Sequence, residues 1–148
     1  MIRPAVQQSG KGGTFVLPTT NITAPGGEFG SIPIGAPFFG QDVTNKNLCK
    51  SFIVTCSPKI QISCILGYFN GTPAATAIFA LDIIVPIHFG KPANETLDLV
   101  VSGPNEGNNN GPFLYTLSGT IGASYASIER GVRFFFLRLN NPHLSSFV

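Results

Sequence analysis

The sequence of 148 residues has few ionisable side chains and no tryptophan. Charged residues make up 11% of the chain and there are two histidines, whereas an average protein contains about 25% Asp, Glu, Lys and Arg. Catalytic, metal-binding and cofactor-binding sites are built from ionisable groups that converge in space. This scarcity argues against an enzyme, and we expect no catalytic residues, no metal ion and no organic cofactor.

Clusters of positive charge and long apolar runs are missing as well. The nine Lys and Arg residues are spread along the chain without a run of three, so nucleic acid is not expected as a direct partner. The longest apolar stretch, residues 77–89, is interrupted by Asp82, Pro86 and His88. A membrane-spanning helix needs about 18 or more consecutive apolar residues, so we expect no insertion into a membrane.

The residues that hydrolytic chemistry needs are scattered. His88 lies in an apolar stretch and His143 in the C-terminal tail, and no G-x-S-x-G nucleophile elbow is present. The segment Ser-Gly-Thr-Ile-Gly at residues 118–122 is interpreted as a turn-rich strand edge.

Residues 103–111 are rich in Asn and Gly but contain one carboxylate, which indicates an exposed connection rather than a calcium loop.

Three cysteines leave at least one thiol unpaired within the chain. The spacing of Cys49, Cys56 and Cys64 lacks the closely spaced pairs of a zinc site. If residues 57–59 form a hairpin turn, Cys56 and Cys64 fall on an apolar face and are interpreted as small buried hydrophobic residues. A Cys49–Cys64 bridge and a disulfide between subunits remain alternatives.

Alternation of apolar residues with a period of two dominates the pattern. In residues 75–89, Phe79, Leu81, Ile83 and Val85 share one face of a strand, and the opposite face is mixed. Such a strand is typical of a sheet packed on a second sheet. No window shows a sustained helical repeat with caps, so helix is expected to be minimal. Strands are predicted at residues 14–17, 32–34, 51–56, 60–68, 75–89, 96–102, 113–121 and 131–139.

This pattern predicts an all-β protein, an antiparallel β-sandwich. The eight-stranded jelly roll is the preferred topology, and an immunoglobulin-like sandwich or an open barrel is the alternative. Residues 1–13 end in a glycine-rich stretch and are predicted to be a flexible N-terminal arm. Residues 14–139 form the single β-sandwich domain, and residues 140–148 form a C-terminal tail.

The last predicted strand is apolar on both faces. If Phe134 and Phe136 point inward, then Phe135 and Leu137 point outward together with Arg133, and a two-layer sandwich has nothing to cover them. Low surface charge and apolar chain ends also indicate surfaces that need a partner. We predict an assembly interface built from Ile2, Val6, Arg133, Phe135, Leu137 and Phe147.

These observations favour a structural self-assembling subunit over an enzyme. The preferred function is a viral capsid or decoration protein located in the virion, whose partners are copies of itself or other lattice proteins and which forms a homo-oligomer. Two alternatives are an extracellular or cell-surface fibre subunit and a carbohydrate-binding β-sandwich module. The module is disfavoured because sugars stack on aromatic rings, and the chain has no Trp and three Tyr.

Overall fold

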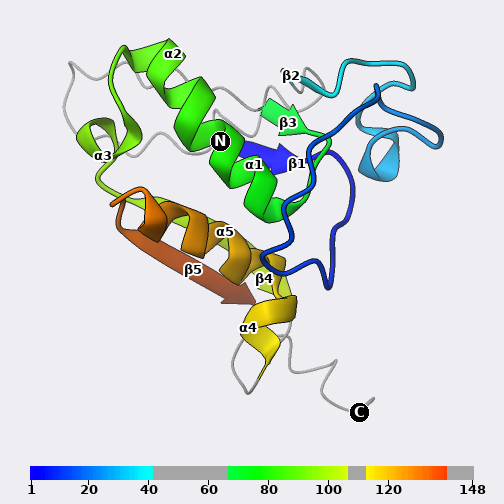
Figure 1. Cartoon of the computed structure of the whole chain (residues 1–148). Helices are drawn as coiled ribbons and strands as arrows, with labels where there is room; N and C mark the ends of the chain where they lie inside the picture. The colour runs from blue at the N-terminus through cyan, green and yellow to red at the C-terminus, as the bar shows by residue number, and fades with distance from the viewer. Residues whose placement is uncertain (42–66, 107–112, 140–148) are drawn as a thin grey trace. The chain divides into compact units, whose positions relative to one another are not determined.

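The computed structural model describes residues 1–41, 67–106 and 113–139 (Figure 1). The chain divides into two compact units, each with its own internal contacts. Unit 1 comprises residues 1–7 and 17–71, and unit 2 comprises residues 8–16 and 72–148. All three cysteines and the predicted strand at 51–56 lie outside the described residues.

Unit 1 is built on a small mixed sheet. The central strand β3 (Gly67–Phe69) pairs in parallel with β1 (Ile2–Pro4) and antiparallel with β2 (Phe39–Gln41). A short 3-10 helix, η1 (Glu28–Gly30), lies in the long connection between β1 and β2.

The core of unit 1 is small and depends on side chains from that connection. The hydroxyl of Tyr68 donates a hydrogen bond of 3.0 Å to the carbonyl of Pro37, so the aromatic ring is buried without leaving its polar end unsatisfied. The buried residues that form this core are Ala5, Ile22, Ile32 and Tyr68.

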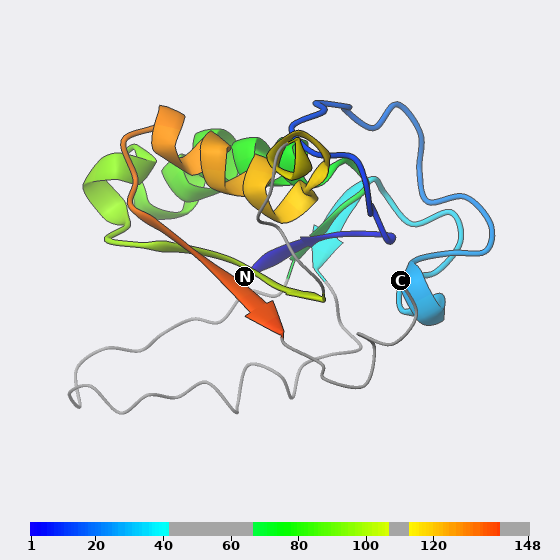
Figure 2. The same ribbon diagram turned by 90° about the horizontal axis from the view of Figure 1, so that it is seen from below.

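Unit 2 contains a parallel strand pair joined through helices. Strand β4 (Val100–Glu106) pairs in parallel with β5 (Phe134–Leu139), and the connection between them contains α4 (Leu114–Leu117) and α5 (Gly119–Glu129). Parallel strands require such a crossover because a tight hairpin can join only antiparallel strands. Figure 2 shows α5 lying along one face of the β4–β5 pair.

A nearly continuous helical segment precedes β4. It consists of α1 (Pro73–Phe79), the π-helical turn η2 (Ala80–Ile84) and α2 (Val85–Phe89), and it is followed by the short helix α3 (Ala93–Thr96). Proline at the first position of α1 suits a helix start, because its fixed φ is helical and it has no N–H to leave unpaired.

Gly90 ends this helical segment. It has φ 72°, a left-handed conformation that glycine adopts without strain, and its N–H donates a 2.8 Å hydrogen bond to the carbonyl of Pro86.

The core of unit 2 lies between the helices and the strands. Its members are Leu81, Ala93 and Val132, with Val85, Leu97 and Val100 packed against them.

The all-β prediction is wrong, because the described residues contain both helices and strands. The predicted strand at 75–89 is helical, and the predicted strand at 113–121 is α4 and the first turn of α5. The apolar residues at 79–89 fit the period of two that predicts a strand, and they also fit the period of a helix. Leu81 and Val85 lie one helical turn apart, and both face the unit 2 core. Buried small residues in α1 (Ala74, Ala75 and Thr76) allow close helix packing, which overrides the β propensity of the isoleucines around them.

The predicted arm also differs from the structure. Residues 2–4 form β1 and Ala5 is completely buried, so the first part of the arm is a strand of unit 1. Gly12 and Gly13 pack on the end of α4 and the first turns of α5 within unit 2. None of the described helices is long and apolar enough to cross a membrane.

Candidate functional site

A glycine-rich turn lies against the start of α5 in unit 2. Lys11, Gly12, Gly13 and Thr14 form the turn, which is closed by a 2.9 Å hydrogen bond from the Thr14 N–H to the Lys11 carbonyl. Gly12 has φ 52°, and its N–H donates a 2.8 Å hydrogen bond to the carbonyl of Leu117. The turn is therefore held by backbone contacts and keeps a conformation that favours glycine.

Two glycines are required because backbones meet closely at this point. A Cβ atom on Gly12 would overlap the carbonyl of Thr116, and a Cβ atom on Gly122 would overlap the carbonyl of Gly12. Gly119, the first residue of α5, is similarly crowded, since an added Cβ would lie 2.6 Å from Cγ of Pro73. The turn, the start of α1 and the start of α5 thus come together at one place in unit 2.

The first turn of α5 is capped and anchored to the sheet. Ser118 is the N-cap residue, and its hydroxyl accepts a 3.2 Å hydrogen bond from the N–H of Ile121. The hydroxyl of Ser102 in β4 donates a 2.9 Å hydrogen bond to the carbonyl of Thr120. These contacts place the α5 N-terminus beside β4. Ligands of parallel α/β sheets usually bind outside the carboxyl ends of the strands.

Thr72 holds the chain that leaves the turn. Its hydroxyl donates a 2.5 Å hydrogen bond to the carbonyl of Thr14 and accepts a 3.2 Å hydrogen bond from the N–H of Val16. Since Thr72 is buried, water does not compete for these bonds. We call the turn at residues 11–14 and the start of α5 at residues 118–122 the cradle.

The cradle is suited to an anion. Backbone N–H groups at a helix N-terminus have no acceptor within the helix and carry the positive end of the helix dipole. Glycine-rich turns that meet such a helix start are common anion-binding elements. Lys11 is exposed in the turn and adds a positive charge. In residues 1–41, 67–106 and 113–139, no three His, Cys, Asp or Glu side chains gather as a metal site would need.

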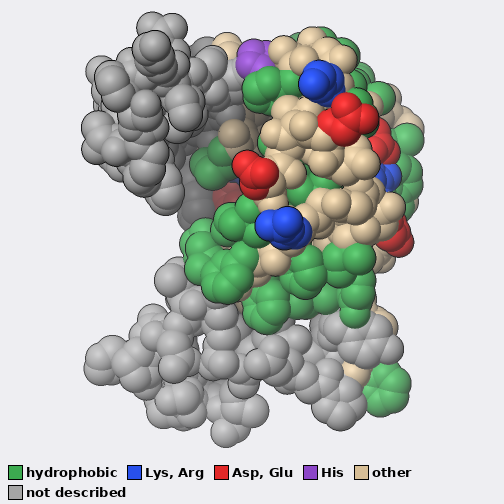
Figure 3. All heavy atoms as spheres, turned by 90° about the vertical axis from the view of Figure 1, so that its left-hand side faces the viewer, with side chains coloured by type: hydrophobic (Ala, Val, Ile, Leu, Met, Phe, Trp, Pro, Cys, Tyr) green, Lys and Arg blue, Asp and Glu red, His purple; other side chains and the backbone are tan. Residues whose placement is uncertain are grey.

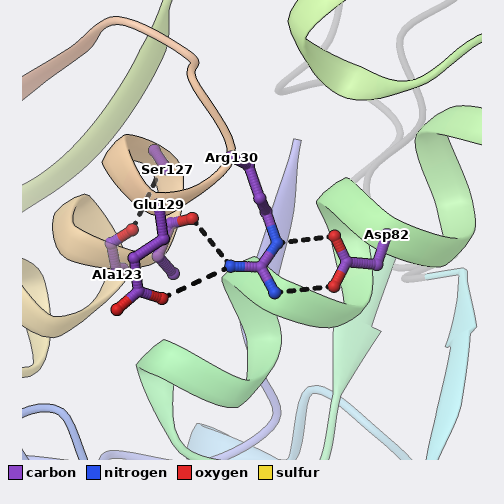
Figure 4. A network of polar contacts seen from close by, with 6 residues as sticks. Asp82, Ala123, Ser127, Glu129 and Arg130 are labelled. Carbon is purple, nitrogen blue, oxygen red and sulfur yellow. Dashed lines mark hydrogen bonds and ion pairs between the residues drawn. The ribbon is translucent and has the colours of Figure 1, made fainter.

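The other end of α5 is fixed by an ion pair. The guanidinium of Arg130 binds both carboxylate oxygens of Asp82 in η2, with Nε–Oδ1 at 2.5 Å and Nη2–Oδ2 at 2.6 Å (Figure 4). Its Nη1 also donates to the carbonyl of Ala126 at 2.9 Å and lies 3.6 Å from Oε2 of Glu129.

This arrangement perturbs the titration of Arg130. The hydrogen bond to Asp82 is the main reason why the pKa of Arg130 lies above its ordinary value, the charges of Asp82 and Glu129 add to the rise, and burial opposes it. The pair joins α5 to the α1–η2–α2 segment, and so it helps to hold the helix whose N-terminus forms the cradle.

The predicted interface residues are divided between the two units, and their role in an assembly interface stays a prediction. Ile2 and Val6 are half-buried in unit 1, whereas Arg133, Phe135 and Leu137 are exposed at or beside β5 in unit 2. Phe147 lies outside the described residues. His88 is exposed on α2, and His143 is also outside the described residues.

The sequence reasoning missed the cradle. It interpreted residues 10–13 as the end of an arm and residues 118–122 as a strand edge. A signal was available, because Ser118 followed by a small-residue segment is a possible N-cap. The contact between the two glycine-rich segments, however, spans most of the chain and has no local signature.

Comparison with known proteins provides an independent indication of function. The family model described as survival protein SurE matches residues 1–135. The chain is 46% identical over 143 residues to a protein named acid phosphatase from Yarrowia lipolytica, a match that covers 97% of this chain and 34% of that protein. It is 33% identical over 96 residues to a Saccharomyces cerevisiae protein named probable tubulin–tyrosine ligase PBY1, covering 64% of this chain and 11% of that protein. The chain therefore spans about a third or less of the length of these two relatives.

These matches overturn several predictions made from the sequence. A chain that matches this family and a yeast acid phosphatase is not a capsid or decoration protein, and its predicted location in a virion is wrong. The prediction that the chain is not an enzyme is contradicted by the same matches. Low charge does not exclude an enzyme, because backbone N–H groups can bind an anion with few charged side chains.

Proposed function

The chain belongs to the SurE family, and on this premise we propose that it acts as a phosphatase whose cradle binds the phosphate group of a phosphate ester. The observation that carries the proposal is the 46% identity to a protein named acid phosphatase over 97% of this chain. The geometry of the cradle supports it, because tetrahedral oxyanions are the ligands that helix N-termini and glycine-rich turns bind best.

The cradle would contribute to catalysis through position and charge. In phosphoryl transfer, negative charge is spread over the equatorial oxygens of the transferring group, and catalysis depends largely on holding and stabilising that group. The N–H groups of Gly119 and Thr120 at the start of α5 and of Gly13 in the turn would donate to those oxygens. The N–H groups of Gly12, Thr14 and Ile121 already donate to acceptors within the protein. The ammonium group of Lys11 would balance part of the charge of the phosphate oxygens. Since backbone donors do not reorganise during the reaction, their stabilisation is available at the transition state.

The proposed reaction therefore depends on a cradle whose donor groups keep fixed positions. The hydrogen bonds of Thr72 and Ser102 and the contact between Gly12 and Gly122 hold its parts within unit 2. Displacement of donor groups by even about 1 Å can lower a rate by about 100-fold. We expect substitutions at these contacts to reduce the rate constant even though their side chains do not touch the substrate.

The direct test combines hydrolysis with binding. Release of p-nitrophenol from p-nitrophenyl phosphate measures activity across the acid range, and isothermal titration calorimetry with inorganic phosphate measures occupation of the cradle. We expect saturable hydrolysis and competition by phosphate. Loss of one charged donor typically weakens binding by about 10-fold, so Lys11→Met should weaken phosphate binding by about that factor. Lys91→Met is the matched control, because Lys91 is also exposed in unit 2 but follows α2.

A second pair of variants separates charge from folding. Ser118→Asp keeps an N-cap acceptor for α5 but places a negative charge in the cradle, so helix stability should be retained while phosphate binding is lost. Ser118→Thr keeps the cap without the charge and should bind phosphate. Equal phosphate affinity in the Asp and Thr variants, or phosphate bound without any hydrolysis, would contradict the proposal.

A further inference from the structure

Exposed apolar side chains border the cradle in unit 2. Phe15 directly follows the glycine-rich turn and is 49% exposed, and Leu117 directly precedes Ser118, the N-cap residue of α5, and is 54% exposed. Phe113, which lies just before α4, is 73% exposed. We call Phe15, Phe113 and Leu117 the rim.

Backbone contacts hold two members of the rim next to the cradle. The N–H of Gly12 in the turn donates a 2.8 Å hydrogen bond to the carbonyl of Leu117. The buried hydroxyl of Thr72 bonds to the backbone on both sides of Phe15, donating to the carbonyl before it at 2.5 Å and accepting from the N–H after it at 3.2 Å. The main chain that carries these two side chains therefore has a fixed position relative to the cradle.

The third member, Phe113, has a strained backbone conformation. Its φ is 68°, and in the part of the chain that the structure describes it is the one residue other than glycine with a positive φ. Bulky side chains avoid this left-handed region for steric reasons. Two hydrogen bonds from Thr116 to the Phe113 carbonyl, at 3.0 Å from the N–H and 2.5 Å from the hydroxyl, hold the conformation. Thr116 also links Phe113 to the cradle, because its carbonyl is the group that a Cβ atom on Gly12 would overlap.

Neither the strain nor the exposure of Phe113 stabilises the fold. Glycine would adopt the same φ without a steric penalty, and a polar side chain would leave less apolar surface in water. Figure 3 shows other hydrophobic side chains on the described surface, so exposure alone does not mark a site. Strained residues, however, cluster at sites that hold ligands. The strained backbone, the exposed ring and the link to the cradle together indicate that Phe113 binds a ligand.

We propose that the rim receives the organic group of the phosphate ester, and that this group is an uncharged aromatic ring, as in a benzyl ester. The inference deepens the proposed function by naming a substrate class, and it rests on the anion-binding cradle of that proposal. Residues 8–16 and 113–122 contain a single charged side chain, Lys11. The surroundings of the cradle thus offer a positive charge to the phosphate and an apolar surface to the rest of the molecule. Aromatic rings gain more from contact with phenylalanine than from burial of their area alone.

The first test uses binding and needs no catalysis. Benzylphosphonate and methylphosphonate carry the same anionic group, differ in the ring, and cannot be hydrolysed as esters can. Isothermal titration calorimetry with the full chain measures the dissociation constant of each. We expect benzylphosphonate to bind at least about 10-fold more tightly than methylphosphonate.

Variants of the rim test which side chains make the difference. Phe113→Gly and Phe15→Ser should each lower the ratio of the two affinities by about 3- to 10-fold, since each removes one ring contact. Damage to the cradle weakens both phosphonates alike and cancels in the ratio. Phe89→Ser is the matched control, because Phe89 in α2 is 56% exposed and lies outside the rim. This variant should keep the original ratio.

The stability of Phe113→Gly separates a ligand contact from a structural one. The variant relieves the strained φ and removes a side chain that is largely in water. The greater entropy of glycine in the unfolded chain offsets part of the gain. We therefore expect a urea midpoint equal to that of the original chain or higher by up to about 0.5 M. A lower midpoint would show that the ring stabilises the fold, and it would overturn the proposal.

The second test measures hydrolysis of benzyl phosphate and methyl phosphate. In both reactions the bond between phosphorus and the ester oxygen breaks, water supplies the new oxygen on phosphorus, and the leaving oxygen takes up a proton. Because the two leaving alcohols have similar acidity, the ratio of the kcat/KM values reports contacts with the ring. This ratio should favour benzyl phosphate and should fall in Phe113→Gly as the binding ratio does.

The outcomes distinguish this inference from the proposed function. Equal affinities for the two phosphonates, or a ratio that Phe113→Gly leaves unchanged, overturn the role of the rim, and hydrolysis of both esters would still support a phosphatase. Preferential binding of benzylphosphonate without hydrolysis of either ester overturns the phosphatase and supports the rim as a binding site. A chain that binds neither phosphonate overturns both.

Discussion

Replacing Gly12 with alanine tests the closest contact in the cradle. The comparison is with Gly10→Ala, because the two glycines lie in the same segment with similar backbone conformations, φ 52° at Gly12 and φ 72° at Gly10. They differ in their surroundings. An added Cβ at Gly10 meets no atom within 4 Å, whereas at Gly12 it overlaps the carbonyl of Thr116.

The expected loss of stability follows from these differences. A left-handed conformation costs an alanine about 1 to 2 kcal/mol, and the reduced entropy of the unfolded chain offsets about 0.4 to 1 kcal/mol of this. Gly10→Ala should therefore lower the free energy of unfolding by about 1.5 kcal/mol or less. At Gly12 the added methyl meets a backbone atom that cannot rotate away, and such overpacking costs a further 1 to 3 kcal/mol or so. Movement of the turn would also weaken the hydrogen bond to Leu117, which contributes about 1 kcal/mol.

Urea unfolding followed by far-UV circular dichroism measures both variants. For a difference of about 2 to 4 kcal/mol and a slope of about 2 kcal/mol per molar urea, the midpoint of Gly12→Ala should fall about 1 to 2 M below that of Gly10→Ala. If the proposed function is correct, hydrolysis of p-nitrophenyl phosphate should fall in the same order, because the turn forms one side of the cradle. Equal midpoints for the two variants would refute the close approach of residue 12 to α4, and with it the geometry of the cradle.

Three further variants address α5. Gly122→Ala would favour a helix by about 1 kcal/mol from propensity alone, but we expect net destabilisation because the methyl would overlap the carbonyl of Gly12; a higher melting temperature would contradict this. Ser118→Ala should lower the free energy of unfolding by about 1 kcal/mol through loss of the N-cap, and an unchanged urea midpoint would show that the cap is unimportant. A double-mutant cycle of Asp82→Asn and Arg130→Met should give a coupling of about 0.5 to 1 kcal/mol, small because Asp82 is 44% exposed. Since the pKa of Arg130 is raised, its contribution is present below its ordinary pKa and is lost only above the raised value. The coupling should therefore be constant from neutral pH to about pH 10, and a fall within that range would contradict the assignment.

Some structural features could be predicted from the sequence. The alternation in the last strand correctly places Phe135 and Leu137 on an exposed side, and the strand predicted at 131–139 contains β5. Period-two alternation depends only on the pleat of a single strand, so it can be read locally. The glycines at residues 10–13, by contrast, were interpreted as the end of a flexible arm, and the turn that the structure contains there was not predicted.

The helical segment at residues 73–89 shows why local patterns failed elsewhere. Its β-branched and aromatic residues favour strands, and its apolar positions fit both a period of two and a helical period. The choice between them comes from packing, since small residues of α1 are buried and Leu81 and Val85 reach the core of unit 2. That core includes Val132 and Val100, which lie far along the chain.

The sequence by itself determined the apolar outer side of β5 and the shortage of charged side chains. Only the tertiary structure decided that β4 and β5 pair in parallel through α5, and that Gly12 meets Gly122. The physical reason is that an anion site built from backbone N–H groups depends on where helix ends and turns meet. Backbone donors are present at every residue except proline, so their convergence is a property of the fold, and no residue type in the sequence identifies it.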